Sequence, residues 1–180
     1  MIGRAILLGG LLAATSACGG SKPEPAAPAG GGAAAPAALT QDAWADYSSW
    51  HLMSTEKWIS KTHGGRFVEI YVNDIGFEAY KNEDAELPAG TIIVKPSWAN
   101  AGGQPGAEGP IFVMDKKPAG FAPDHEDLAY EFVWKNPTGK WAGKGPIDWA
   151  TPSKKVDYCW DCHENYEREL GYVPKGKRAW

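Results

Sequence analysis

The sequence contains few residues that could bind a metal or a sulfur-linked group: three cysteines, three methionines and four histidines among 180 residues. It has no continuous apolar run of the roughly 20 residues that a membrane-spanning helix needs. It also lacks an excess of positive charge, since 18 basic side chains stand against 22 acidic ones. These absences argue against a membrane-spanning helix and against a nucleic-acid-binding protein.

The first eighteen residues have the pattern of an export signal. Arg4 precedes a short apolar run at 5–14, and the small residues 15–17 precede Cys18. This order is typical of a secretory signal peptide. A cysteine directly after the small residues indicates a bacterial lipoprotein signal, in which Cys18 is acylated; an ordinary secretory signal is the alternative. We therefore expect a signal peptide over 1–17 and an exported, periplasmic protein that is lipid-anchored to a bacterial membrane.

The next segment has almost no side chains that could form a core. Residues 19–40 consist largely of Gly, Ala and Pro, so we expect 18–40 to be a lipidated cysteine followed by a disordered tether. Without Arg4, 17 basic side chains face 22 acidic ones, a net charge of −5. Residues 41–180 remain as one domain, because a chain of this length buries roughly 68–70% of its unfolded surface in a single core.

The pattern of the domain predicts an α+β fold, a mainly antiparallel sheet with flanking helices and a C-terminal helix. The connections are too short for most parallel crossovers. We expect strands at 66–73, 91–95, 110–115 and 127–134. We expect loops at 96–109 and 136–152, and helices at 41–50, 54–61, 75–82 (capped by Asp74) and from about 152 through 163.

The segment Cys159-Trp160-Asp161-Cys162-His163 carries the chemistry. C-x-x-C-H is the signature of covalent c-type haem attachment. On a helix, residues three and four apart share a face, so both thiols can reach the haem vinyl groups while the histidine binds the iron. We predict one covalent haem c, held by Cys159 and Cys162, with His163 as the axial ligand of the iron.

Other interpretations of the two cysteines stay open. They could form a structural disulfide. A thioredoxin-like redox pair is less well supported because the βαβ context is absent, and a zinc site would need a further donor at suitable spacing. The export signal favours haem, and with Cys18 taking lipid no cysteine is left over.

The other side of the iron decides between functions. A strong sixth ligand would make an electron carrier, and an empty position would make a gas binder or an enzyme. Five residues could supply a sixth ligand, and each of them, taken alone, more often has a structural role or faces solvent: His51, His63, His125, Met53 and Met114.

Five stretches support a family resemblance: HGGRFVEIYVND (63–74), LPAGTIIVK (87–95), FVMDKKPAGF (112–121), AYEFVW (129–134) and CWDCH (159–163). In this order they resemble the cytochrome P-460 family, which includes the cytochromes c-prime-beta. The resemblance implies a largely antiparallel β fold with accessory helices, a homodimer, and a five-coordinate haem with His163 as proximal ligand.

The resemblance also implies roles for two further residues. In P-460 enzymes a lysine is joined covalently to a haem edge carbon, and Lys95 holds the matching position; a lysine that ends a strand can equally extend into water. A distal carboxylate relays protons in some of these enzymes. Asp115 is the candidate here, although a solvated strand end beside Lys116 and Lys117 would also explain it.

Three functions follow as hypotheses. The first is an oxidoreductase that oxidises hydroxylamine or nitric oxide, and the second is a gas-binding protein whose cavity is walled by Phe77, Phe112 and Phe121. The third is a single-haem electron carrier. The expected partners are a small nitrogenous ligand, a redox partner cytochrome, a second copy of the chain and, through Cys18, a membrane.

Overall fold

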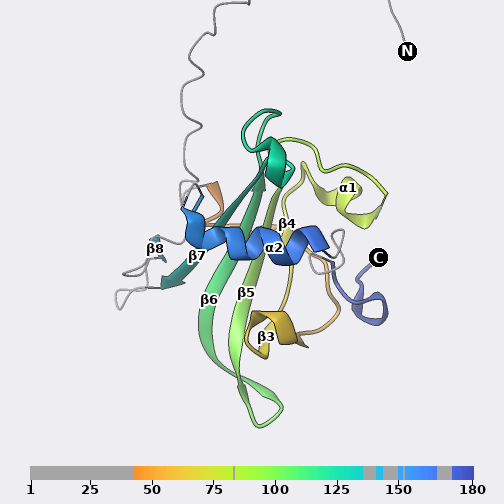
Figure 1. Ribbon diagram of the computed structural model, residues 1–180. Coiled ribbons are helices and arrows are strands. Elements are labelled where there is room, and N and C mark those ends of the chain that lie inside the picture. Colours follow the sequence, from red (N-terminus) through yellow and green to blue (C-terminus); the bar gives the residue numbers. More distant parts are fainter. Residues whose placement is uncertain (1–42, 83, 136–140, 144–149, 152, 166–171) are drawn as a thin grey trace, which may run out of the picture. The chain divides into compact units, whose positions relative to one another are not determined.

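The computed structural model (Figure 1) describes residues 43–82, 84–135, 141–143, 150–151, 153–165 and 172–180. The segments interpreted as a signal peptide (1–17) and a lipidated tether (18–40) lie outside these residues, so both assignments stay predictions. Within the described ranges, no helix is long and apolar enough to cross a membrane.

One antiparallel sheet forms the centre of the domain. Its eight strands are β1 (His51–Leu52), β2 (Trp58–Ser60), β3 (Arg66–Val68), β4 (Tyr71–Val72), β5 (Ile92–Ala101), β6 (Gln104–Lys116), β7 (Leu128–Lys135) and β8 (Trp141–Gly143). The main order is β1–β4–β5–β6–β7–β8, and β3 pairs with both β2 and β5. These strand pairings are antiparallel, which confirms the predicted α+β fold.

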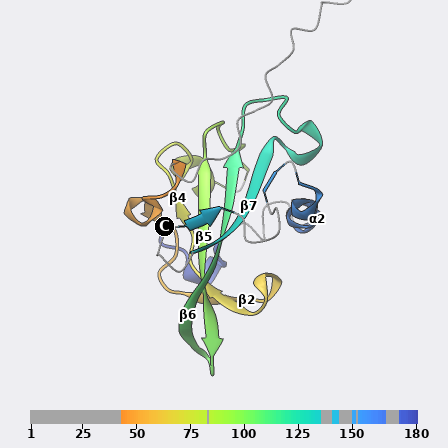
Figure 2. The same cartoon turned by 90° about the vertical axis from the view of Figure 1, so that its left-hand side faces the viewer.

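Short helices surround the sheet. They are η2 (Tyr47–Ser49), η3 (Lys61–His63), α1 (Phe77–Lys81), η4 (Pro123–His125), η5 (Lys154–Val156), α2 (Asp157–Asn165) and η6 (Lys175–Lys177). The expected C-terminal helix over the C-x-x-C-H motif is confirmed as α2. Figure 1 shows α2 crossing the long strands β5, β6 and β7, and Figure 2 shows it on one side of the sheet.

The two faces of the central strands bury different side chains. Register aligns Lys95, Phe112 and Phe132 across β5, β6 and β7. Side chains alternate along a strand, so these three residues share one face. Tyr130 lies on the same face and packs against Trp160 of α2. The opposite face carries a separate apolar cluster: Trp44, Ile92, Val94, Ile111, Val113 and Val133.

The prediction of a loop over 96–109 was wrong, because β5 and β6 continue through it as a hairpin. Ala101 pairs with Gln104, so the turn is Gly102-Gly103, with φ of 63° and 88°. A two-residue hairpin turn with both φ positive strongly favours glycine. Two register shifts, between Pro96 and Trp98 and between Trp98 and Asn100, interrupt the pairing. Such bulges let a strand accommodate a proline, which has no N–H to donate.

Other local expectations differ in detail. The predicted helix over 54–61 was wrong: its second half is strand β2, which pairs with β3 over three residues, followed by the start of η3. The predicted strand 66–73 divides into β3 and β4, which both pair with β5. In the described part of 41–50 the structure shows the 3-10 helix η2 and no α-helix. The helix within 75–82 and the strand within 127–134 are confirmed as α1 and β7.

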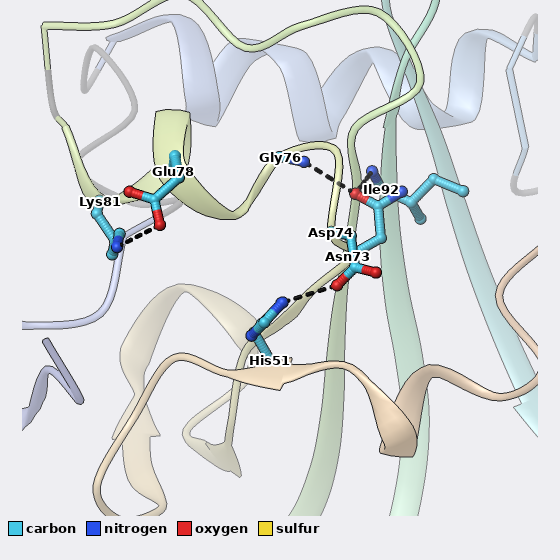
Figure 3. Close-up of polar contacts among 7 residues, drawn as sticks. All are labelled: His51, Asn73, Asp74, Gly76, Glu78, Lys81 and Ile92. Carbon is cyan, nitrogen blue, oxygen red and sulfur yellow. Dashed lines mark hydrogen bonds and ion pairs between the residues drawn. The ribbon is translucent and has the colours of Figure 1, made fainter.

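Polar contacts join the start of α1 to the sheet (Figure 3). The Oδ1 of Asn73 accepts hydrogen bonds from the N–H groups of Gly76 and Ile92, each at 3.2 Å. Asp74 does not cap α1 as expected, since the N-cap residue is Gly76. Asp74 pairs instead with His51, with 2.8 Å between Oδ1 and Nε2.

Candidate functional site

The chain that leads into α2 is tied to β7. The Thr151 N–H donates to the Tyr130 carbonyl at 2.9 Å, and the Tyr130 N–H donates to Thr151 Oγ1 at 2.9 Å. Within α2, the buried Trp160 packs on Tyr130 and stacks on His125, with 5.1 Å between ring centroids. One side of α2 is therefore used for packing on the sheet and on the loop that carries His125.

The next side of α2 presents the motif to a cavity. Cys159, Cys162 and His163 are three and four residues apart, share a helix face, and all line this cavity. No disulfide joins the two cysteines. Burial, and then the neighbouring Cys162, raise the pKa of Cys159 to about 11. Redox-active cysteine pairs have a thiol of lowered pKa, so the structure does not support a thioredoxin-like pair.

His163 is suited to bind a metal. Burial, and then the nearby charge of Lys95, lower the pKa of His163 to about 3. The imidazole is therefore neutral near neutral pH and keeps a nitrogen lone pair. Its Nδ1 is buried and has no hydrogen-bond partner among the residues that the structure describes. A buried ring nitrogen without a partner is an unusual cost to the fold unless a ligand or water meets it.

The cavity has a volume of 380 Å³ and lies between α2, the sheet and the η3 turn. Both views show α2 and the turn after β2 on the same side of the sheet (Figures 1 and 2). Four aromatic residues of the sheet line the cavity: Phe112, Tyr130, Phe132 and Trp134. Of the three phenylalanines expected to wall a gas site, only Phe112 lines this cavity. Phe77 stacks on His51 instead, with 3.8 Å between ring centroids.

The η3 turn brings a second imidazole, His63, to the same cavity. Its Nδ1 lies 2.8 Å from Ser60 Oγ and 3.2 Å from Thr62 Oγ1. The ring also meets the Phe112 ring edge-to-face at 4.6 Å. Burial, then Lys95, then His163, lower the pKa of His63 to about 2. The turn ends at Gly64, whose φ of 71° is in the left-handed region that glycine adopts without strain.

Lys95 lies beside the cavity on the same face of the sheet. It is not among the described lining residues, and only 5% of it is exposed. Its charge nevertheless acts on His63, Cys159 and His163. Burial lowers the pKa of Lys95 to about 8, and Cys159 partly opposes this effect. The interpretation of Lys95 as a lysine that extends into water therefore does not fit the structure.

Arg66 places a cation at the wall of the cavity. Its Nε donates to Ser97 Oγ at 2.9 Å, and Ser97 Oγ donates to the Pro110 carbonyl at 2.6 Å. The guanidinium packs over Gly109, where an added Cβ would lie 1.8 Å from an Arg66 nitrogen. The absence of a side chain at Gly109 therefore leaves the space that Arg66 occupies. Sequence reasoning did not single out Arg66, because one arginine at the start of a strand carries no local signal.

The structure does not bring Asp115 to the cavity. Register pairs Asp115 with Ile92, on the face opposite Lys95. Its Oδ2 forms an ion pair with Lys117 Nζ at 2.6 Å. The alternative of a solvated strand end is only partly met, because Asp115 lies beside Lys117 but is 5% exposed. Four of the five sixth-ligand candidates also lie elsewhere among the described residues, since only His63 lines the cavity: His51, His125, Met53 and Met114.

The residues at the cavity fit haem better than a bare metal ion. Among the described residues, no group of three or more His, Cys, Asp or Glu side chains could hold a metal ion, so a protein-only zinc site is unsupported. Two thiols, a buried imidazole nitrogen without a partner and an aromatic wall suit an iron carried by a flat macrocycle. The fold and the site together define a haem-binding cytochrome.

The comparison with protein families supports this conclusion. The model of the Cytochrome P460 family matches residues 44–173, so the chain belongs to this family. The match runs from Trp44, the first buried residue in the described part of the chain, to Val173 and includes the whole of α2. No curated protein matches the chain.

Proposed function

We propose that this protein is an exported mono-haem c-type cytochrome that binds and oxidises small nitrogen compounds such as hydroxylamine or nitric oxide. The observation that carries the proposal is the convergence of Cys159, Cys162 and His163 on one aromatic cavity. Bound haem would supply a redox-active iron with one position open to a small ligand. The membership of the Cytochrome P460 family supports haem as the cofactor.

The protein's own residues would attach and orient the cofactor. Each cysteine adds its S–H across one vinyl group, so that one S–C bond and one C–H bond form and no atom leaves. His163 offers a neutral ring nitrogen to the iron, because its low pKa keeps the ring unprotonated. Arg66, which is held by the hydrogen bond that it donates to Ser97, would offer a cation to the carboxylates of haem.

The aromatic wall would control what reaches the cofactor. Phe112 and Phe132 pack edge-to-face at 5.3 Å between ring centroids, and both line the cavity. Rings in such contact leave little room for bulky ligands, and they replace water by an apolar surface. Small uncharged nitrogen compounds are therefore the substrate class that this wall admits best.

The test uses the full chain, produced in a host that matures c-type cytochromes. We expect acid–acetone to extract no haem, and mass spectrometry to find haem on the peptide that contains Cys159 and Cys162. Ferric and ferrous optical spectra should show an open iron position, and nitric oxide and hydroxylamine should each change them. The Cys159→Ala/Cys162→Ala double variant is the matched control, from which haem should be extractable. Complete extraction from the unchanged chain would refute the proposal.

A second candidate, gas binding without oxidation, is favoured by the same aromatic wall, and Lys95 separates the two. A neutral Lys95 amine could join a haem edge carbon, forming one N–C bond and losing two hydrogens to a peroxide as two-electron oxidant. The pKa of about 8 gives a neutral fraction near pH 7 far above that of an ordinary lysine. A haem bridge to a Lys95 peptide, with a strongly red-shifted ferrous Soret band, would support the enzyme. An unbridged haem with an ordinary five-coordinate spectrum would favour gas binding.

The cellular setting forms part of the proposal. Export through the signal over 1–17, lipid on Cys18, a redox partner cytochrome and a homodimer are all proposed from the sequence and the resemblance. The intact mass of the membrane-extracted protein should show a diacylglyceryl group on Cys18. A soluble mature protein with a thiol at Cys18 would instead indicate ordinary secretion.

A further inference from the structure

His63 is an imidazole at the cavity that the proposed function does not use. It comes from η3, far in sequence from α2, and it lines the same cavity as His163. Three contacts hold its ring: the hydroxyls of Ser60 and Thr62 at Nδ1, and the Phe112 ring. A side chain fixed in this way by neighbours from one turn and one strand is preorganised for a polar contact.

The contacts at Nδ1 define which ring nitrogen remains for the cavity. Ser60 Oγ lies 2.8 Å and Thr62 Oγ1 lies 3.2 Å from Nδ1. When Nδ1 accepts a hydrogen bond from the Ser60 hydroxyl, a neutral imidazole carries its proton on Nε2. The low pKa of His63 agrees with a neutral ring. Nε2 is then a hydrogen-bond donor next to the wall formed by Phe112.

We propose that His63 donates a hydrogen bond from Nε2 to the small molecule bound in the cavity, and that His63 is not itself an iron ligand. The inference rests on the proposed haem at Cys159, Cys162 and His163. It narrows the ligand class to small molecules whose bound form has a hydrogen-bond-accepting end, such as hydroxylamine or cyanide. Carbon monoxide accepts hydrogen bonds poorly and should gain little from His63.

The anchoring of the ring supports donation over iron ligation. With Nδ1 accepting from the Ser60 hydroxyl, Nε2 carries the ring proton and offers no lone pair to an iron. The turn itself is short and ends at two consecutive glycines with positive φ, Gly64 and Gly65. The contacts of the ring with Ser60, Thr62 and Phe112 hold the imidazole at the wall, where its Nε2–H can meet a ligand without binding the metal.

The experiment measures cyanide binding to the ferric protein and carbon monoxide binding to the ferrous protein, each on the full haem-loaded chain. In His63→Leu we expect cyanide affinity to fall about 10- to 100-fold, the size expected for a hydrogen bond to a charged acceptor. Carbon monoxide affinity should change less than about threefold by the same reasoning. His63→Gln, which keeps an N–H donor, should recover part of the cyanide affinity.

Two further variants separate positioning from general damage. Ser60→Ala keeps the imidazole but removes the closest hydroxyl that holds its ring. Cyanide affinity should therefore fall by less than in His63→Leu. His51→Ala is the matched control, because His51 pairs with Asp74 away from the cavity (Figure 3). Its cyanide and carbon monoxide affinities should equal those of the unchanged protein.

The inference is overturned if His63→Leu retains haem and binds cyanide as tightly as the unchanged protein. It is also overturned if the unchanged protein is low-spin and six-coordinate and becomes high-spin in His63→Leu, since His63 would then be the sixth ligand. If His63→Leu does not take up haem, unaltered cyanide binding in Ser60→Ala/Thr62→Val would refute it. An unchanged protein without covalent haem refutes the proposed function itself, and this is known before any variant is made.

Discussion

Replacing Lys95 with methionine should stabilise the haem-free domain at neutral pH. Lys95 is only 5% exposed, and burial is the largest cause that lowers its pKa from 10.5 to about 8. Methionine has a similar length and no charge, so it keeps most of the packing and removes the cost of burying an ammonium group. A buried lysine that carries this cost is expected of a residue with a chemical role.

The size and the pH dependence of the effect follow from the two pKa values. Below pH 8 the lysine is protonated in both the folded and the unfolded chain, so the folded domain bears the full free-energy cost of burying the ammonium group. The fall from 10.5 to about 8 corresponds to roughly 3 kcal/mol at 1.36 kcal/mol per pKa unit. Between these values the unfolded chain binds more protons, so the stability of the lysine protein rises with pH. Above about 10.5 the cost is gone.

Urea unfolding of the haem-free domain, residues 41–180, at pH 7 and at pH 10.5 measures this difference. At pH 7 the Lys95→Met midpoint should be higher by about 1–3 M, since urea m-values are about 1–3 kcal/mol/M for small domains. At pH 10.5 most of this difference should disappear. Lys154→Met is the matched control, because Lys154 is exposed and should change stability by less than about 0.5 kcal/mol. A stabilisation that does not depend on pH, or no stabilisation at pH 7, would refute the reasoning.

Two further substitutions test the cavity walls. Tyr130→Phe removes a buried hydroxyl that has no hydrogen-bond partner among the described residues. The free energy of unfolding of the haem-free domain, measured by thermal unfolding, should therefore rise by about 1 kcal/mol. A clear fall in that free energy would instead reveal an ordered water on the hydroxyl. Gly64→Ala should destabilise by about 1–2 kcal/mol, because φ is 71° and an added Cβ meets no atom, so backbone strain alone acts. Gly176→Ala, also in open space but without a positive φ, should be near neutral, and equal effects at Gly64 and Gly176 would contradict the strain argument.

The sequence predicts those features that depend on short-range patterns. C-x-x-C-H fixes three side chains on one face of α2, because helix geometry alone relates positions three and four apart. The alternation in 127–134 predicts β7 for the same reason. The α+β class followed from the short connections between strands.

Features that depend on pairing between distant segments could not be predicted from short-range sequence patterns. The segment 54–61 has helix-forming residues, yet Trp58–Ser60 pairs with β3, and this tertiary contact outweighs a weak local preference. Glycines and prolines in 96–109 were interpreted as a loop, although Gly102-Gly103 forms a hairpin turn. Without that hairpin the register of Lys95 with Phe112 is unknown, and so is the face on which Asp115 lies. The position of His63 at the cavity likewise depends on how η3 packs against α2.

The two bulges in the hairpin have a consequence for how the protein can vary. Asn100 pairs with Pro105, Trp98 with Glu108 and Pro96 with Ile111, so each bulge places one extra residue on β6. Next to the cavity, buried side chains on both faces fix the pairing, whereas most side chains between 100 and 108 are exposed. An insertion or deletion between 100 and 108 would therefore change the faces on which only the exposed side chains of the hairpin tip lie.

Length changes, labels or grafted peptides between 100 and 108 should accordingly leave the pairing of Lys95 with Phe112 intact. This tolerance should end at Gly109, because the Arg66 guanidinium fills the space that a side chain there would need. The hairpin thus has an outer part, residues 100–108, whose length and sequence can vary, and an inner part whose pairing is constrained by the adjacent cavity.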